Sequence, residues 1–352
     1  MECPKDLQSW LNHFSCPAFS VNENTIVACN QAAEGLLILP GADVRQLLLT
    51  GRELWETHPE GCLYLKLNLS PEGYGAAVTR QGDGFLFLLE QDPEDAALRS
   101  LALAARELRN PLSNLMIASD KLTQLSQEAP SSQEWLARLK RSLNQIHRLV
   151  NNMSDASRQD ILANAGFHEW NRLIHDMFER IQTQLVHTNV CVSFEGLPEP
   201  VYGYCKEAQL ERAILNVVSN AMKFMPEGGQ IHARLTRHGS MLHLSITDTG
   251  SGIAATVLDS IFCRYQRQPA IEDSRYGLGL GLVLIRNAAA NHGGTVLIDS
   301  PDGKGTRVTI TLAIRQEASA FKEPIQTFLS DDTRGILREL SDCLPWEAYQ
   351  ND

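Results

Sequence analysis

The chain has 352 residues, 43% of them hydrophobic, which suffices for two or three domains with ordinary cores and excludes global disorder. Its formal net charge of −11 argues against nonspecific nucleic-acid binding, so we expect no nucleic-acid partner. The eight cysteines form no Cys-x-x-Cys pair, which favours free thiols in a reducing cytosol. The apolar runs are shorter than the roughly 20 residues that cross a bilayer, and the first residues do not resemble a signal peptide. We therefore expect a soluble, cytoplasmic protein without a membrane span.

Residues 1–92 mix short apolar runs with Gly, Pro and Asn breaks, a pattern that predicts a small α+β domain. The expected strands are Ala18–Val21, Thr25–Cys29, Cys62–Leu69, Tyr74–Thr79 and Phe85–Leu89. The stretch at 16–34 resembles the opening hairpin and first helix of a PAS sensor domain. The resemblance implies a PAS-like sensor domain, and another small α+β fold is the alternative.

Residues 95–158 predict two long helices, because apolar residues recur at alternating spacings of three and four. These are Leu98, Leu101, Ala105, Leu108, Leu112, Leu115 and Leu122, then Leu136, Leu139, Leu143, Ile146, Val150 and Met153. Residues 127–133 contain the breaks expected of the turn between the helices. A lone hairpin buries both apolar stripes poorly, so we expect a homodimer that forms a four-helix bundle. Packing against another domain of the same chain is the alternative.

The first of these helices contains the sequence Ala-Arg-Glu-Leu-Arg-Asn-Pro-Leu at 105–112. It resembles the phospho-acceptor box of sensor histidine kinases, in which a His stands at the position of Arg106. A guanidinium is protonated at physiological pH and has no lone pair to attack phosphorus, whereas an imidazole has one. Without the resemblance, Arg106 and Asn110 are ordinary exposed residues one helical turn apart.

Residues 160–315 predict an α/β domain, in which strands alternate with helices. A first motif reads Asn216-Val-Val-Ser-Asn220-Ala-Met-Lys223-Phe224. Its two asparagines lie four residues apart and therefore on one face of a helix. An Asn carbonyl is a suitable ligand for Mg²⁺, which prefers oxygen. Taken alone, two asparagines on a helix are more often a polar surface.

A second motif, Asp248-Thr-Gly250-Ser-Gly252-Ile253, follows a strand-like run of apolar residues. An Asp at a strand end can accept a hydrogen bond from the amino group of adenine, and glycines let the backbone approach the base closely. A tight turn is the alternative, since Asp and Gly are common turn residues.

A third motif, Ile261-Phe262-Cys-Arg264, opens a segment of residues 264–276 that is rich in arginine. The arginines of this segment could contact phosphates, and a solvated basic loop is the alternative.

A fourth motif, Gly277-Leu-Gly279-Leu280-Gly281-Leu282, places glycines before a predicted helix, where backbone N–H groups are free to hold phosphate oxygens. A Rossmann dinucleotide site does not fit the context, because no βαβ unit with a ribose-binding acid follows. A final glycine pair precedes Thr306 and the last predicted strand.

Together the four motifs have the order and spacing of the ATPase domain of histidine kinases, which gyrase-type ATPases share. The resemblance covers about residues 95–315 and implies Mg-ATP as the cofactor. It implies the metal ion at Asn220, phosphates near Asn216 and Lys223, and adenine near Phe224. Further ATP contacts are implied at Asp248, Gly250, Gly252, Ile253, Phe262, Arg264, Gly277, Gly279, Leu280, Gly281, Leu282 and Thr306.

In this family the γ-phosphoryl group of ATP moves to the bundle His and then to an Asp on a response regulator receiver domain. The acid after the His, here Glu107, serves as proton acceptor. Arg106 closes this route, and His147 on the second helix is the alternative acceptor. Glu107 and Asn110 also match the pattern of members that dephosphorylate their response regulator, in which Asn110 would orient a water molecule.

Three hypotheses follow for the function. The chain is a histidine kinase whose acceptor lies elsewhere, a response-regulator phosphatase gated by ATP, or a non-catalytic pseudokinase that binds another kinase or a regulator. The fold is common to all three hypotheses. It is a multidomain α+β chain with a PAS-like domain (1–92), a dimerising antiparallel helical hairpin (95–158), an α/β-sandwich ATPase domain (160–315) and a tail (316–352). In the tail, Thr333–Leu344 predicts a short amphipathic helix that covers a surface or binds a partner.

Overall fold

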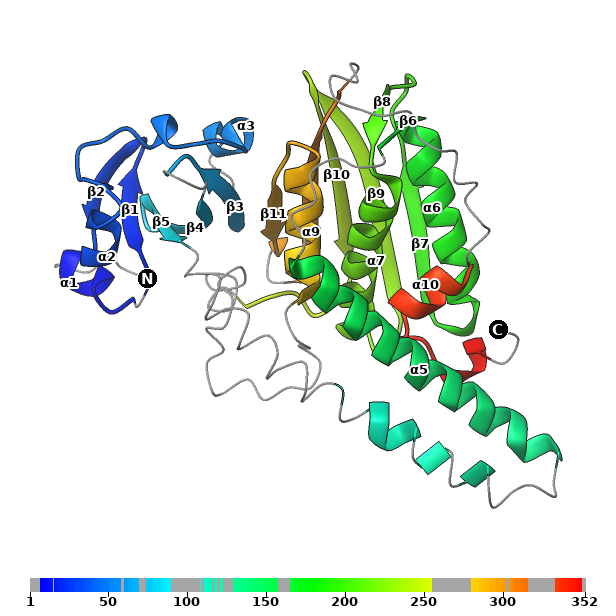
Figure 1. Ribbon diagram of the computed structural model, residues 1–352. Helices are drawn as coiled ribbons and strands as arrows, with labels where there is room; N and C mark the ends of the chain where they lie inside the picture. Colours follow the sequence, from blue (N-terminus) through cyan, green and yellow to red (C-terminus); the bar gives the residue numbers. More distant parts are fainter. Residues whose placement is uncertain are drawn as a thin grey trace.

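The structure is a computed structural model (Figure 1). It describes residues 7–14, 16–57, 60–69, 74–89, 108, 111–115, 117–118, 121–122, 129–157, 165–254, 280–301, 304–315 and 333–349. Arg106, Glu107 and Asn110 therefore lie outside the described residues, as does most of the first predicted long helix. Within the described ranges, none of the helices is long and apolar enough to span a bilayer.

The N-terminal part contains α1 (Leu7–Leu11), β1 (Ala18–Asn22), β2 (Thr25–Cys29), α2 (Gln31–Glu34), η1 (Val44–Gln46), α3 (Arg52–Glu56), β3 (Cys62–Leu67), β4 (Tyr74–Gln81) and β5 (Gly84–Leu89). The five predicted strands are confirmed to within two residues at either end. Aromatic residues pack on one another in the core, where the rings of Phe19 and Phe87 stack at 4.6 Å and Trp55 meets the ring of Phe85 at 4.7 Å.

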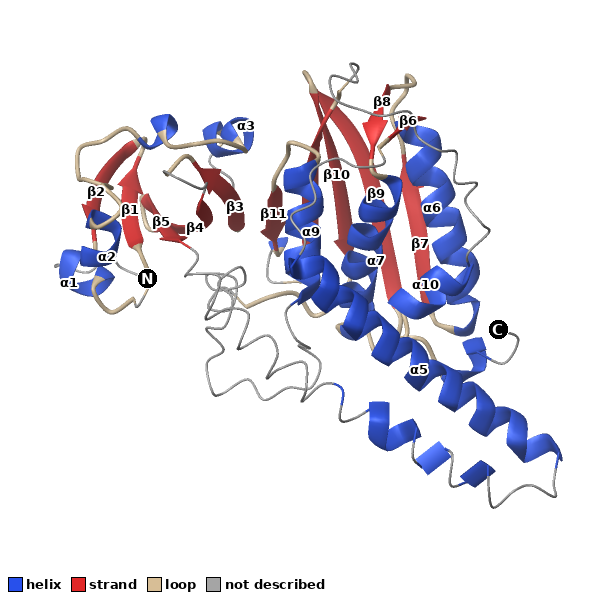
Figure 2. Ribbon diagram, in the orientation of Figure 1, coloured by secondary structure: helices blue, strands red, loops and turns tan. Residues whose placement is uncertain are grey.

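The C-terminal part contains β6 (Gly166–Glu169), α6 (Trp170–Gln184), η2 (Leu185–His187), β7 (Val190–Glu195), β8 (Tyr202–Cys205), α7 (Glu207–Lys223), β9 (Gly229–His238), β10 (Met241–Asp248), α9 (Leu280–Asn291), β11 (Val296–Asp299) and β12 (Arg307–Ala313). Helices α6, α7 and α9 lie along one face of the strands (Figure 2). Buried and half-buried residues alternate along β10, as expected of a strand with one face on the core.

A single ten-stranded sheet joins the two parts, in the order β2-β1-β5-β4-β3-β11-β12-β10-β9-β7. The junction is an antiparallel pairing of β3 with β11, in which Leu63 lies opposite Leu297. The side chains reinforce it, because the Thr295 hydroxyl donates to the carbonyl oxygen of Tyr64 and the guanidinium of Arg286 lies 4.1 Å from the Tyr64 ring. The sequence did not predict this pairing, which satisfies two strand edges at once.

Helix α5 (Ala129–Ser157) is the second helix of the predicted hairpin. It begins within the predicted turn. Pro130, which was expected to break the helix, lies in the first helical turn, where its missing N–H costs nothing. One side of α5 packs on the rest of its own chain and buries Ala137, Arg148 and Asn152. The predicted seam lies elsewhere, and Leu136, Leu143 and Val150 are 45%, 51% and 51% exposed.

The tail folds back as α10 (Thr333–Glu339) and η5 (Trp346–Tyr349). The predicted helix ends at Glu339, earlier than expected, and turns follow it. The apolar residues that suggested it are nevertheless buried in the core of the C-terminal part: Ile336, Leu337, Leu340 and Leu344. Of the two predicted roles for this helix, the structure bears out the covering of a surface.

Candidate functional site

Polar contacts gather where β10 ends, and we call Asp248, Gly250, Thr306 and Phe224 the strand-end group. The Asp248 Oδ1 atom accepts hydrogen bonds from the backbone N–H of Gly250 at 2.8 Å and of Thr306 at 3.1 Å. Burial raises the pKa of Asp248, and these hydrogen bonds oppose the rise. A carboxylate accepts about four hydrogen bonds, so Asp248 keeps acceptor capacity for a ligand.

Two glycines allow this strand-end group to close. A Cβ atom at Gly250 would lie 2.9 Å from Asp248 Oδ1 and 3.0 Å from the carbonyl oxygen of Phe224. Gly305 has a φ of +66°, and a Cβ atom there would collide with the carbonyl oxygen of Asp248. The Gly305 N–H donates to the Gly250 carbonyl at 2.9 Å, which ties the two loops together. The glycines of both motifs therefore serve close backbone packing around Asp248.

A second set of contacts lies on α7, and we call Asn216, Ser219, Lys223, Arg148 and Asp342 the helix-side group. The Nη2 atom of Arg148 donates to Asn216 Oδ1 at 3.3 Å and to Ser219 Oγ at 3.2 Å. Both Arg148 Nη1, at 2.8 Å, and Lys223 Nζ, at 3.2 Å, contact Asp342 Oδ2. The polar side chains of three segments that are distant in sequence therefore meet on one helix.

The start of α9 lies beside the helix-side group. A Cβ atom at Gly281 would lie 3.1 Å from Asn216 Oδ1, so the predicted phosphate-binding glycines run up to this asparagine. Asn220, one turn further along α7, is half-buried and has no hydrogen-bond partner among the described residues. Its carbonyl oxygen is therefore available to a metal ion, and the arrangement suits the hard oxygen ligation that Mg²⁺ prefers.

The other predicted site residues divide into two sets. Gly252, with a φ of +73°, and the partly buried Ile253 and Leu282 lie near the groups just described, and Leu280 begins α9. The remaining predicted ATP contacts lie outside the described residues: Phe262, Arg264, Gly277 and Gly279. His147, the alternative acceptor, is exposed on α5.

Sequence reasoning missed Arg148, Ser219 and Asp342. Arg148 is only 5% exposed, although a basic residue on an amphipathic helix normally faces water. Arg148 is two residues away from both seam residues Ile146 and Val150, so it lies on the opposite side of the helix. This position was the available signal. Asp342 stands between the apolar residues Leu340 and Leu344, which is the signal the sequence offered for an acid beside a packed surface.

Buried His292 follows the fourth motif and has a structural part. Its Nδ1 lies 2.7 Å from the carbonyl oxygen of Ala288, and its Nε2 accepts from the Lys206 N–H at 3.1 Å. Burial lowers the pKa of His292, so the ring is neutral and joins the end of α9 to the start of α7.

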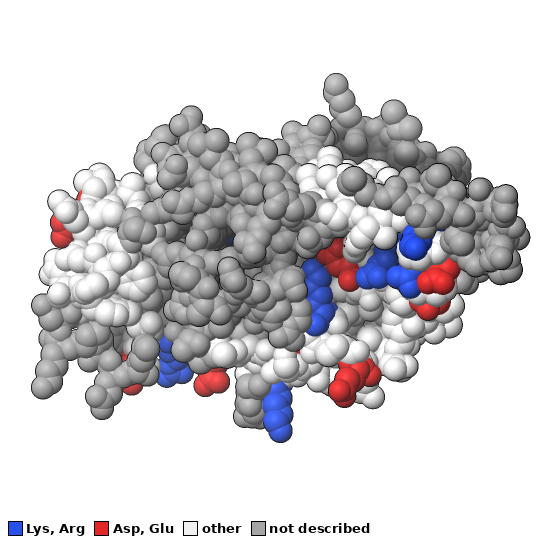
Figure 3. Space-filling view, turned by 90° about the horizontal axis from the view of Figure 1, so that it is seen from below, with Lys and Arg blue, Asp and Glu red and all other residues white. Residues whose placement is uncertain are grey.

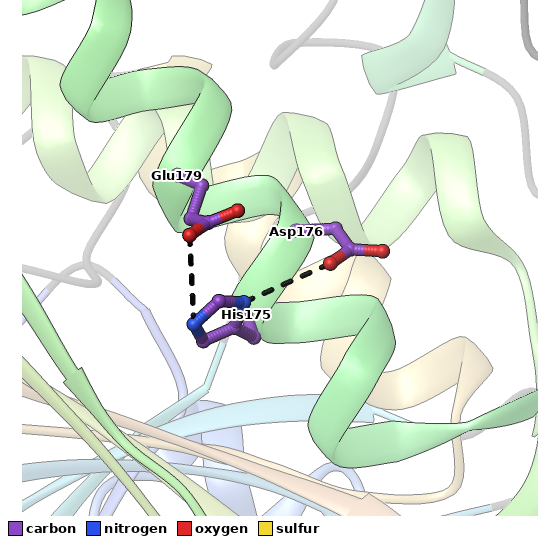
Figure 4. A group of neighbouring side chains, drawn as sticks. All are labelled: His175, Asp176 and Glu179. Carbon is purple, nitrogen blue, oxygen red and sulfur yellow. Dashed lines mark ion pairs between the residues drawn. The ribbon is translucent and has the colours of Figure 1, made fainter.

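A separate group of titratable side chains lies on α6, where His175 pairs with Asp176 at 3.7 Å and with Glu179 at 3.8 Å (Figure 4). All three side chains are exposed, and we assign no ligand to them. Basic and acidic side chains also lie next to one another on the described part of the face shown in Figure 3. Such exposed pairs contribute little to stability.

Comparison with known proteins agrees with this geometry. Residues 205–316 match the family model of the histidine kinase-, DNA gyrase B- and HSP90-like ATPases, and residues 97–161 match the His Kinase A (phospho-acceptor) domain. The fold and the site thus define an ATPase of the histidine kinase, gyrase and HSP90 class.

The relatives narrow the class to one family. The chain is 29% identical over 220 residues to the sensor histidine kinase RppB of Synechocystis sp., covering 60% of this chain and 48% of RppB. It is 30% identical over 226 residues to the histidine protein kinase DivJ of Caulobacter vibrioides, covering 61% and 37%. A solved complex of histidine kinase ThkA with response regulator protein TrrA aligns with a TM-score of 0.46 at 15% identity, covering 87% of this chain and 98% of that one.

The chain belongs to the sensor histidine kinases of two-component systems. It spans about half or less of the length of the two curated relatives named above. The match to the His Kinase A (phospho-acceptor) domain spans residues 97–161 and so includes Arg106.

Proposed function

We propose that this chain binds Mg-ATP between α7, the end of β10 and the start of α9, and that it acts in two-component signalling without phosphorylating position 106. The observation that supports the ATP site most strongly is the pairing of two groups on one helix. The strand-end group holds Asp248 as an acceptor for the adenine amino group. The helix-side group offers to the phosphates Lys223, which directly precedes Phe224, and Asn216, which lies about 10 Å further back along α7.

Each part of the nucleotide has a matching residue in this proposal. Phe224, half-buried beside Gly250, packs by the base. Asn220 lies on α7 between Asn216 and Lys223 and supplies an oxygen ligand to Mg²⁺. The backbone N–H groups at the start of α9 face the phosphates, aided by the positive end of the helix dipole. When bound, the metal ion would neutralise charge on the phosphate oxygens.

Arg106 determines what the bound nucleotide can do. It has no lone pair for attack on the γ-phosphorus, so the usual self-phosphorylation is closed at this position. His147 is an exposed imidazole on α5 and is the other candidate acceptor in the hairpin. The ATP site therefore serves to control the hairpin, or to phosphorylate an acceptor in another kinase.

A second candidate function rests on Asn110. The pattern Glu107-x-x-Asn110 is present although the His is not, and water-mediated dephosphorylation of a response regulator needs no nucleophilic His. In this case ATP sets the shape of the hairpin, and Asn110 orients the attacking water. Loss of phosphatase activity in Asn110→Ala would support this function, whereas unchanged signalling in Asn110→Ala and Asn220→Ala would leave the non-catalytic pseudokinase.

The proposed partners are a second copy of the chain and the receiver domain of a response regulator. Leu136, Leu143 and Val150 recur every seven residues on α5 and are about half exposed. This spacing is that of a helical seam, and pairing with a second copy would bury it. The opposite side of α5 is already buried on its own chain, so dimerisation does not compete with that contact.

The test is incubation of the full chain with Mg-ATP labelled on the γ-phosphate. We expect measurable ATP binding and no acid-labile label on the protein. Label that disappears in His147→Ala would instead establish a kinase with a displaced acceptor. Label that persists in His147→Ala, or the absence of ATP binding, would contradict the proposal.

A further inference from the structure

The C-terminal segment, residues 333–349, is an integral part of the fold rather than a loose tail. Leu340, Leu344 and Tyr349 are 0% exposed. The Tyr349 hydroxyl donates to the carbonyl oxygen of Leu337 at 2.8 Å, which closes the segment on itself. Burying large apolar side chains stabilises a fold, so the segment is firmly attached. Its polar residues are therefore held in fixed positions.

The C-terminal segment fastens α5 to the rest of the chain. The Nε of Arg141 and the side-chain amide of Gln145 donate to the carbonyl oxygen of Ser341 at 3.0 and 3.2 Å. Arg148, one turn further along, lies 3.5 Å from Glu339 and 2.8 Å from Asp342. These contacts cover one side of α5 from Arg141 to Arg148 and leave its seam uncovered.

Asp342 occupies a distinctive position within the helix-side group. One of its oxygens, Oδ2, contacts two cations at once, Arg148 from α5 and Lys223 from α7. Burial alone would raise the pKa of Asp342, but these cations outweigh it and hold the pKa below its usual value. Asp342 is therefore an anion at neutral pH, and an anionic oxygen between an Arg and a Lys is the arrangement in which proteins hold phosphate.

The proposed nucleotide site and Asp342 involve the same residues. Lys223 is the residue proposed to contact the phosphates, and here its ammonium group is paired with Asp342. Asn216, proposed to lie near the phosphates, accepts from the guanidinium of Arg148. The start of α9, which would cradle the phosphates, reaches Asn216 at Gly281. Arg148 is thus within reach of the phosphate end of the site.

We propose that Arg148 and Lys223 form a two-cation site for the phosphates of a nucleoside triphosphate, and that the Asp342 carboxylate fills this site as an intramolecular competitor. The proposal rests on the ATP site proposed above. Binding of the triphosphate displaces Asp342 from both cations and so loosens the C-terminal segment from α5. Because the two events share Arg148 and Lys223, the nucleotide and the segment oppose each other's binding.

This arrangement gives ATP a route to the hairpin that needs no phosphoryl transfer. When Asp342 leaves, the contacts of Ser341 with Arg141 and Gln145 weaken together with it, because they belong to the same turn. Helix α5 is then free to change its position relative to the ATPase domain. A signalling protein without its acceptor His would still respond to ATP in this way.

The experiment measures the affinity of Mg-ATP for the full chain, for Asp342→Asn and for the matched control Glu347→Gln. Glu347 lies in the same segment but has no ion pair with Arg148 or Lys223. We expect Asp342→Asn to bind about tenfold more tightly, which corresponds to roughly 1.4 kcal/mol, and Glu347→Gln to match the unmodified chain. Equal or weaker binding by Asp342→Asn, with Mg-ATP still bound by the unmodified chain, overturns the competitor proposal alone.

Other outcomes separate this proposal from the ATP site itself. Absence of binding in all three proteins overturns the proposed function and this inference with it. Binding by all three proteins, about tenfold tighter for Asp342→Asn, supports both. A second measurement uses only the unmodified chain, in case the variant folds poorly. Hydrogen exchange of the amides at 340–344 should accelerate when Mg-ATP is added, and unchanged exchange at saturating ATP overturns the proposal.

Discussion

The strand-end group and the helix-side group meet at the C-terminal end of α7, where Lys223 directly precedes Phe224, but they are built differently. Around Asp248 the contacts are backbone N–H groups of Gly250 and Thr306, fixed by the fold. In the helix-side group they are side chains of α5, α7 and the C-terminal segment, which a ligand can replace. Under the proposed function, the adenine end is therefore preorganised, whereas the phosphate end is occupied by the chain itself.

The largest expected effect comes from removing the central cation of the helix-side group. Arg148→Ala removes a buried guanidinium and leaves Glu339 with Arg212 and Asp342 with Lys223 as remaining partners, so we expect a loss of about 1–3 kcal/mol. Arg172→Ala on α6 is the control, because its pair with Asp176 is exposed and worth about 0.5 kcal/mol or less. Urea unfolding of both variants makes the comparison. Similar losses in the two would show that the helix-side group is not a buried network.

Smaller effects on stability, of opposite sign in the two groups, are expected from Asp248 and Asp342. Folding raises the pKa of Asp248 through burial, so its ionised form costs stability at neutral pH and the cost fades as pH falls through the raised pKa. Folding lowers the pKa of Asp342, because Arg148 and Lys223 outweigh its burial. Its ionised form therefore stabilises the protein above the unfolded pKa of about 4, and this contribution is lost as pH falls through the folded value.

Thermal unfolding of two variants over a pH series checks these signs. At pH 7 we expect Asp248→Asn to raise the free energy of unfolding by about 0.5–1 kcal/mol, since the Asn amide oxygen still accepts from Gly250 and Thr306. Asp342→Asn should lower it at the same pH. Both differences should shrink on acidification, that of Asp248→Asn at the higher pH. If the free energy of unfolding changed in the same direction in both variants, the contrast between the strand-end group and the helix-side group would be contradicted.

Much of the site could be predicted from local sequence patterns. Asn216 and Asn220 share α7 because of their spacing, and Asp248 ends β10 because an alternating apolar run precedes it. Gly250 and Gly305 were expected to permit close backbone approach, and they do so around Asp248. These features depend on residues near one another in sequence, which periodicity and turn chemistry describe well.

What the sequence could not give were contacts between distant segments. Arg148 and Asp342 are 194 residues apart, and each alone is a charged residue on an amphipathic stretch. The pairing of β3 with β11 likewise joins two strands, and the sequence pattern of each strand alone does not indicate its partner. In both cases the contact depends on which surfaces meet in space, and local sequence propensity does not indicate this.

The most direct test of the account is calorimetric titration of the full chain with ATP in the presence of Mg²⁺, beside Asp248→Asn and Asp299→Asn. Both acids end strands of the same sheet, and burial raises the pKa of each, but Asp299 pairs with Arg307, whereas Asp248 accepts from Gly250 and Thr306. We predict that ATP binds and that Asp248→Asn weakens binding about 30-fold, the worth of a hydrogen bond to a charged group, while Asp299→Asn changes it little. Equal binding by Asp248→Asn and the unmodified chain, or no binding up to millimolar ATP, would contradict the account.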